Sequence, residues 1–212
     1  MSCTQPLRLT DTDPKFYSSA FTRVYCHYMY EYIPLLGLIL ASGSLVLTII
    51  SIAILIDYVM YKSAYLGQKL TTLLWPLIIA TSIGGVALAL LYSEYFLYVP
   101  CSLCWLQRIA LFPQALLVIL AWRMNDTKYF PSYGIGLSIF GLLVAIYQYI
   151  YQMLPVEVRE SGITPCLIDG SNADCANKVI DHFGFVTFPF ISAITFVFLI
   201  ALYLTLKRVS QK

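Results

Sequence analysis

The sequence predicts an all-α integral membrane protein with five transmembrane helices, and composition and charge spacing are the observations that predict it. Of the 212 residues, 59% are hydrophobic and 11% are charged, a composition typical of chains that lie in a bilayer. A hydrocarbon core of about 30 Å requires about 20 apolar residues at a helical rise of about 1.5 Å. The 13 basic and 11 acidic residues are spread along the chain, so no basic patch indicates nucleic-acid binding.

Four uncharged runs are long enough to cross the membrane, and a fifth is shorter. The uncharged runs cover residues 33–56, 70–93, 129–156 and 183–206. The fifth, residues 105–122, carries Arg108 in its first turn, where a long side chain can extend to the interface while the rest of the helix stays in lipid. Residues 1–32 lack the apolar core of a secretion signal, so the first run is expected to direct insertion itself.

Lysine and arginine in the short loops set the expected orientation, because they favour the cytoplasmic side. Two loops and the C-terminal tail carry Lys62, Lys69, Arg123, Lys128, Lys207, Arg208 and Lys212. Segments 92–104 and 155–182 are poor in basic residues, so both are expected on the exported side of an inner or plasma membrane. An odd number of spans places residues 1–32 on that side too, although Arg8, Lys15 and Arg23 oppose this placement.

Four of the six cysteines form two pairs by spacing, and all six fall in the segments expected outside or at the outer interface, where disulfides persist. Two residues separate Cys101 from Cys104, and eight separate Cys166 from Cys175. The CxxC pair closes too small a loop to act as a staple and is typical of reactive redox sites, whereas the wider pair alone would more often be structural. Four thiolates holding zinc are an alternative that the wide second spacing disfavours.

The residues around CxxC indicate a role for Arg108. Pro100 disfavours helix just before it, so the next helix is expected to begin at residues 101–104. The helix N-terminus and Arg108, one turn further on, both favour the thiolate form of Cys104. A thiolate at the membrane edge suits a lipid-soluble acceptor such as a quinone, with Arg108 donating to a ring carbonyl oxygen. Anchoring of the helix end among lipid phosphates is the other interpretation of this arginine.

Three segments together resemble the disulfide bond formation protein B family, most closely its BdbC-type branch. They are PCSLCWLQR at 100–108, GITPCLIDGSNADC at 162–175 and HFGFVTFPFISAITF at 182–196. The resemblance covers residues 70–208 and implies a four-helix transmembrane bundle with two exported cysteine loops. To this bundle the chain adds one N-terminal transmembrane helix. Gln107 stands where some members of the family carry an acid.

The resemblance implies a membrane thiol:quinone oxidoreductase that reoxidises a soluble thioredoxin-fold dithiol oxidase of the DsbA or BdbD type. Two electrons would pass to a quinone, ubiquinone or menaquinone, and disulfide formation in exported proteins would be supported. The partner's thiolate would attack Cys166, and Cys175 would pass electrons on to Cys101. Cys104 would react with the quinone, with Arg108 as its electrostatic support. No metal ligand set is expected.

The division expected from this resemblance has three parts. Residues 1–32 form an exported segment, 33–69 an extra transmembrane helix with a cytoplasmic loop, and 70–212 the bundle. Cys3 and Cys26, which lie outside the resemblance, would either form a third exported disulfide or remain free.

His182 and two rival assignments complete the expectations. This histidine, next to Asp181, is a candidate proton relay, although a solvated loop histidine is commoner. One rival is an enzyme of the vitamin K epoxide reductase type, but in that family the loop pair precedes CxxC. The other rival is a membrane scaffold whose exported loops are stapled by inert disulfides.

Overall fold

The computed structural model of the protein describes residues 19–61, 66–155, 175–176 and 178–211, with the backbone alone for 19–31 and 66–70. Five helices in this part of the chain are long and apolar enough to cross a membrane: Tyr32–Met60, Thr71–Tyr95, Ser102–Arg123, Phe130–Met153 and Phe188–Val209. The predicted all-α membrane class and all five predicted spans, including the short third one, are therefore confirmed.

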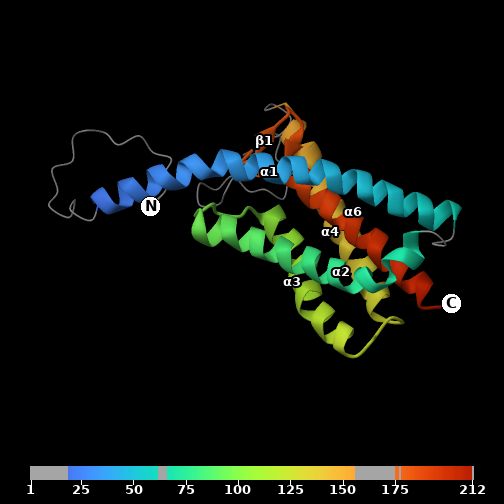
Figure 1. Cartoon of the computed structure of the whole chain (residues 1–212). Helices are drawn as coiled ribbons and strands as arrows, with labels where there is room; N and C mark the ends of the chain where they lie inside the picture. The colour runs from blue at the N-terminus through green and yellow to red at the C-terminus, as the bar shows by residue number, and fades with distance from the viewer. Residues whose placement is uncertain (1–18, 62–65, 156–174, 177, 212) are drawn as a thin grey trace.

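Figure 1 shows the helices and strands of the described residues. In chain order the elements are α1 Ser19–Met60, α2 Leu66–Leu90, the π-helix η2 Leu91–Tyr95, α3 Ser102–Arg123, α4 Phe130–Met153, β1 Asp181–His182, β2 Val186–Thr187 and α6 Phe188–Val209. Helices α2, α3, α4 and α6 form a four-helix bundle in which each packs on the next and α6 closes the ring against α2. The additional helix α1 packs mainly on α6.

Helix α1 is longer than its apolar run. It has 42 residues and begins at Ser19, well before the uncharged run that starts at residue 33, and Pro34 lies inside it without ending it. Residues 19–33 contain neither glycine nor proline, so nothing in this stretch breaks the helix. Hydrophobic length indicates which part of a helix lies in lipid, but it does not indicate where the helix begins.

Glycines on α4 allow α6 to approach closely. A Cβ atom at Gly134 would lie 2.6 Å from ring atoms of Tyr203, and one at Gly141 would overlap the ring of Phe196. Real Cβ atoms do not approach other atoms this closely, so both positions require glycine. Gly136 has nothing within 4 Å of such a Cβ. Close packing of α4 on α6 therefore depends on two of the three glycines of α4.

A cluster of buried polar side chains lies inside the bundle, and we call it the central cluster (Gln114, Ser138 and Tyr203). The hydroxyls of Ser138 and Tyr203 donate to Oε1 of Gln114 at 3.1 and 3.0 Å. Nε2 of Gln114 donates to the carbonyl of Ala110 at 2.9 Å. Since the three side chains come from α3, α4 and α6, their hydrogen bonds tie three helices together in a medium where water offers no substitute.

Candidate active site

The CxxC motif lies where the sequence places it, at the start of α3. Cys101 is the N-cap residue, with extended backbone, and its Sγ accepts a hydrogen bond from the backbone N–H of Cys104. The helix therefore begins at Ser102, in agreement with the break expected near Pro100. Cys104 lies in the first turn, where unpaired N–H groups and the helix dipole favour negative charge.

The two CxxC sulfurs are close and are not bonded to each other. Both residues are free thiols, and their Sγ atoms are 2.9 Å apart. The hydrogen bond to the Cys104 sulfur, followed by burial, holds the pKa of the Cys101 thiol well above its usual range. Cys101 is therefore the thiol that keeps its proton and donates it toward Cys104.

A pair of glutamines supports these sulfurs, and we call the four residues the sulfur cluster (Cys101, Cys104, Gln107 and Gln148). Nε2 of Gln148, on α4, lies 3.4 Å from Sγ of Cys101 and 3.6 Å from Sγ of Cys104. Its Oε1 accepts a hydrogen bond of 2.7 Å from Nε2 of Gln107. A carboxylate at position 107 would have no N–H to donate, so the amide of Gln107 fixes Gln148 with its donor directed toward the sulfurs.

Sequence reasoning missed Gln148 and its neighbour Gln152. Both lie in an uncharged run whose pattern was interpreted only as a span, and both are buried. The signal was present: two amides four residues apart share one face of a helix, and a polar side chain within an apolar span usually faces the protein interior. Nothing local to α4, however, identifies the groups that these amides meet.

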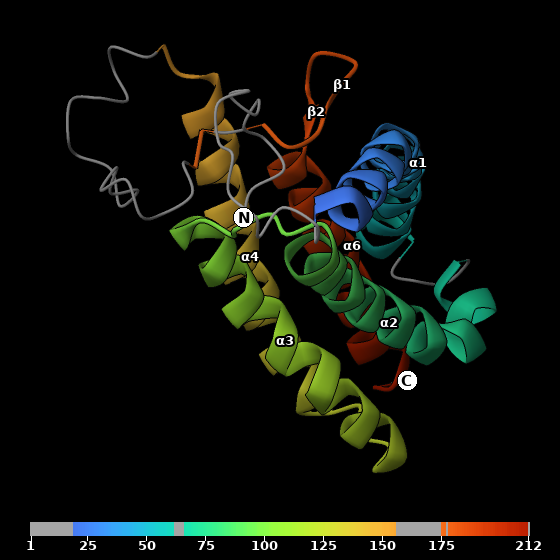
Figure 2. The same ribbon diagram turned by 90° about the vertical axis from the view of Figure 1, so that its left-hand side faces the viewer.

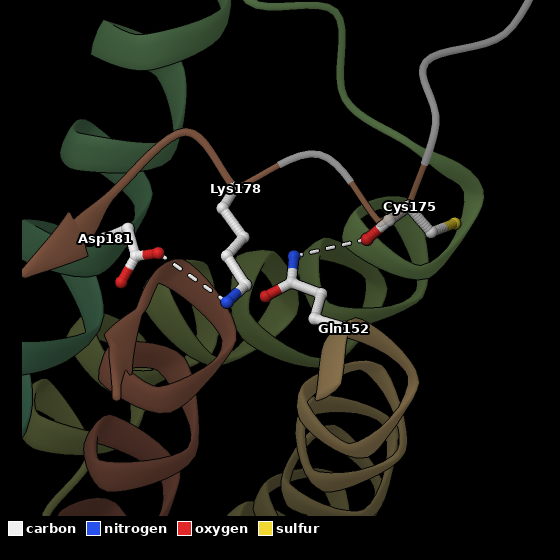
Figure 3. A network of polar contacts seen from close by, with 4 residues as sticks. All are labelled: Gln152, Cys175, Lys178 and Asp181. Carbon is white, nitrogen blue, oxygen red and sulfur yellow. Dashed lines mark hydrogen bonds and ion pairs between the residues drawn. The ribbon is translucent and has the colours of Figure 1, made fainter. Parts of the chain in front are cut away.

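Cys175 lies beside the CxxC pair. It is 1% exposed and belongs to one buried cluster with Cys101, Leu103 and Tyr151. Its carbonyl accepts a hydrogen bond of 3.2 Å from Nε2 of Gln152 (Figure 3). The hydroxyl of Ser102, the residue after Cys101, lies 3.8 Å from Sγ of Cys175.

The structure thus brings together three of the four cysteines predicted as catalytic. Cys175 is disulfide-bonded, and its partner is a cysteine whose side chain lies outside the described residues. Cys166, the fourth predicted catalytic cysteine, lies outside the described residues. So do Cys3 and the side chain of Cys26, and both alternatives for them, a third disulfide or free thiols, stay open predictions.

Arg108 lies one turn beyond Cys104 and is held against α2. Its Nη2 donates to the carbonyl of Ala89 at 2.8 Å. Its guanidinium carbon lies 5.3 Å from the centre of the Trp105 ring and 6.0 Å from that of Phe112. Ala89 lies just before the π-helix η2, a kind of irregularity that is frequent at functional sites. Contact with α2 and with two aromatic rings places this cation within the protein.

The remaining candidate, His182, is not the solvated loop residue that was expected. Its side chain is half-buried, and a Cβ atom added at Gly37 of α1 would lie 2.7 Å from its Nε2. The expectation was wrong because the sequence gives no sign that α1 passes this loop. Within the described part of the chain, no group of three or more His, Cys, Asp or Glu side chains is arranged to hold a metal ion.

Comparison with known proteins identifies the family. Residues 71–206, more than half of the chain, match the family model described as disulfide bond formation protein DsbB. The chain is 33% identical over 133 residues to disulfide bond formation protein C of Bacillus subtilis strain 168, covering 63% of this chain and 88% of that protein. It is 30% identical over 149 residues to a probable disulfide formation protein of Oceanobacillus iheyensis, covering 70% of this chain and 96% of that protein.

A third relative is the SPbeta prophage-derived disulfide bond formation protein B of Bacillus subtilis strain 168, 33% identical over 131 residues, which cover 62% of this chain and 83% of that protein. No solved structure gives a significant match. The matched region coincides with the bundle, and α1 precedes it. With its five membrane-spanning helices and its CxxC at a helix N-terminus, the chain belongs to the DsbB family of disulfide bond formation proteins.

Proposed function

We propose that the protein is a thiol:quinone oxidoreductase that reoxidises a soluble thioredoxin-fold dithiol oxidase and passes two electrons to quinone. The observation that carries this proposal is the burial of Cys175 beside the CxxC pair: Cys101 and Cys175 share one buried cluster, and the sulfurs of Cys101 and Cys104 lie 2.9 Å apart. Three cysteines gathered in this way support a path for thiol–disulfide exchange.

The first exchange takes place at the loop disulfide. The partner's thiolate attacks Sγ of Cys166, the bond to Cys175 breaks, and Cys175 leaves as a thiolate. The partner's second thiolate then attacks the mixed disulfide, so the partner departs oxidised. Cys166 and Cys175 now hold the two electrons, and one proton per sulfur balances the charge.

The second exchange moves these electrons to the CxxC pair. The Cys175 thiolate attacks Sγ of Cys101 in the Cys101–Cys104 disulfide, and Cys104 leaves as a thiolate. Cys166 then attacks Cys175, which restores the loop disulfide and releases Cys101 as a thiol.

The contacts within the sulfur cluster suit Cys104 to leave the CxxC disulfide as a thiolate and then to donate electrons to the quinone. Its sulfur receives the Cys101 thiol at 2.9 Å and the Gln148 amide at 3.6 Å, and it lies at the positive end of a helix dipole. These donors are uncharged, so they stabilise the thiolate without offering it a competing ion-pair partner.

The residues beside Cys104 fit a quinone. A bound quinone would supply the oxidising chemistry, taking up two electrons and two protons. Arg108 would hold a carbonyl oxygen of the ring, because a guanidinium has five N–H donors and the bond to Ala89 uses one of them. The ring of Trp105, which is about half exposed and lies beside this cation, offers an aromatic face next to it.

The proposed placement follows the charge pattern of the loops. Both cysteine-bearing loops and residues 1–32 would lie on the exported side of an inner or plasma membrane. Residues 33–69 would supply the extra helix and a cytoplasmic loop, and residues 70–212 the bundle. Labelling of single introduced cysteines in the loops of intact cells with a membrane-impermeant reagent would check this placement.

One assay tests the function directly. Purified protein is mixed with a reduced thioredoxin-fold dithiol oxidase and a short-chain quinone, and quinone absorbance is followed. We expect one quinone to be reduced for each partner disulfide formed, and partial reduction should yield a mixed species that links Cys101 to Cys175. An inert scaffold would reduce no quinone, and its disulfides would remain closed throughout.

A further inference from the structure

We propose that the additional helix α1 positions the cysteine loop for electron transfer, through the contact of His182 with Gly37. The effect on activity rests on the function proposed above. Helix α1 lies outside the family match, which begins at residue 71, so this role concerns the part of the chain that the family does not explain.

Helix α1 presents a face of small side chains to the bundle. Gly37, Ala41, Ser44 and Ser51 are buried, although α1 contains many exposed aliphatic residues. Spacings of three, four and seven residues keep these positions on one side of a helix, and small residues let two helices approach closely in lipid. Both views show α1 passing across α6 next to the β1–β2 hairpin (Figures 1 and 2).

His182 occupies the space that the missing side chain of Gly37 leaves open. A Cβ atom at position 37 would lie 2.7 Å from Nε2 of His182 and 3.3 Å from its Cδ2. The shorter distance is one that real Cβ atoms do not reach, so any other residue at position 37 would displace either the ring or the helix. The contact is therefore specific to a glycine–histidine pair.

His182 belongs to a segment that connects Cys175 to α6. It pairs with Val186 in the β1–β2 hairpin, and Val186 and Thr187 are fully buried. Between Cys175 and the hairpin, Nζ of Lys178 lies 3.5 Å from a carboxylate oxygen of Asp181. Figure 3 shows this ion pair beside the bond from Gln152 to the Cys175 carbonyl.

The segment is thus held at two places. At Cys175 it is attached to α4 through Gln152, and at His182 it rests on α1. If the contact at His182 is lost, the hairpin loses its support from α1, and the position of Cys175 relative to Cys101 becomes less closely defined. Exchange between sulfurs requires an aligned attack at short range, so a small displacement should slow it strongly.

A contact near the other end of α1 keeps the helix in register. Nη1 of Arg208, at the end of α6, donates to the carbonyl of Tyr58 at 2.5 Å, and its guanidinium carbon lies 3.9 Å from the centre of the Tyr58 ring. This bond fixes the position of α1 along the axis of α6. It therefore also keeps Gly37 level with His182. Tyr58 and Arg208 both lie outside the residues that match the family.

The chain offers a matched pair of variants for the test, Gly37→Leu and Gly43→Leu. Both place the same side chain on α1, but a Cβ atom at position 43 has nothing within 4 Å. Fully reduced full-length protein is mixed with excess short-chain quinone, and quinone absorbance is followed in stopped flow. The first equivalent of quinone reduced reports oxidation of Cys101 and Cys104, and the second reports transfer from the loop dithiol.

We expect Gly37→Leu to slow the second phase by about ten- to a hundredfold and to leave the first phase and the melting temperature close to wild type. Gly43→Leu should change neither phase. His182→Ala, which loses the same contact, should slow the second phase to a similar extent, and the double variant should be no slower than either single variant, because the two positions act through one contact.

Three results would overturn the inference: an unchanged second phase in Gly37→Leu, equal slowing in Gly43→Leu, or a double variant with a second phase clearly slower than in both single variants. A wild-type protein that reduces no quinone would instead contradict the proposed function. In that case acid trapping and mass mapping of the same variants still measure loop-to-CxxC exchange without quinone, so the role of α1 is decided separately.

Discussion

The central cluster and the sulfur cluster are both built on a buried glutamine, yet they differ in what the amide meets. Gln114 receives hydrogen bonds from the hydroxyls of Ser138 and Tyr203 and donates to the Ala110 carbonyl. Gln148 accepts from another amide and directs its donor at two sulfurs. The first arrangement joins helices, whereas the second, in the function proposed above, would stabilise charge on the sulfur that reacts. Burial of a polar side chain therefore does not by itself distinguish a structural role from a catalytic one.

The largest loss of activity is expected when Arg108, the cation beside the sulfur cluster, is replaced. Arg108→Ala should slow quinone reduction by about a hundredfold, because a preorganised donor to the reacting oxygen is lost. Exchange between Cys166 and the partner should stay near the wild-type rate, as measured by trapping of the mixed disulfide. Arg108→Lys serves as the control, since it keeps the charge but not the planar fork. Equal loss of both half-reactions in Arg108→Ala would contradict this role.

A smaller loss of activity is expected when the side-chain amide of Gln148 is removed. Gln148→Leu removes the donor to both sulfurs, and a hydrogen bond to a charged group contributes about 1.5–3 kcal/mol. Quinone reduction should therefore slow by about tenfold or more, as measured in a single turnover of reduced protein. A Gln148→Leu protein with wild-type single-turnover kinetics would remove Gln148 from the site.

The same substitution in the central cluster should affect stability and not chemistry. Gln114→Leu leaves the Ser138 and Tyr203 hydroxyls without their acceptor, and the free energy of unfolding should fall by about 1–2 kcal/mol. Thermal unfolding in detergent measures this loss, and single-turnover quinone kinetics should stay at the wild-type rate. If Gln114→Leu slowed the chemistry as much as Gln148→Leu, the distinction between the two clusters would fail.

The smallest effect on activity is expected from replacing Cys3 and Cys26, which belong to neither cluster. The double variant Cys3→Ala with Cys26→Ala should keep the wild-type rate of quinone-linked oxidation, because the path through Cys175, Cys101 and Cys104 does not include these residues. Normal expression with no activity would show instead that the N-terminal segment takes part in the relay.

The sequence was sufficient for the features that depend on local physics. Apolar length defined the five spans, and Pro100 followed by Cys101 located the start of α3, since both depend on residues close together in the chain. The CxxC motif and Arg108 were predicted as a site because motifs of this kind have a fixed spacing. Gln148 was missed, because an amide in an apolar run shows its role only when its partners on another helix are known.

The amino-acid sequence by itself determined the membrane class, the number of spans and the cysteines proposed as reactive, because hydrophobicity and thiol chemistry belong to individual residues and their near neighbours. Only the tertiary structure decided that Gln148 meets CxxC, that Cys175 shares a cluster with Cys101, and that His182 rests on Gly37. Each of these contacts joins residues far apart in the chain, and such contacts form when helices pack at angles and heights that no local pattern encodes.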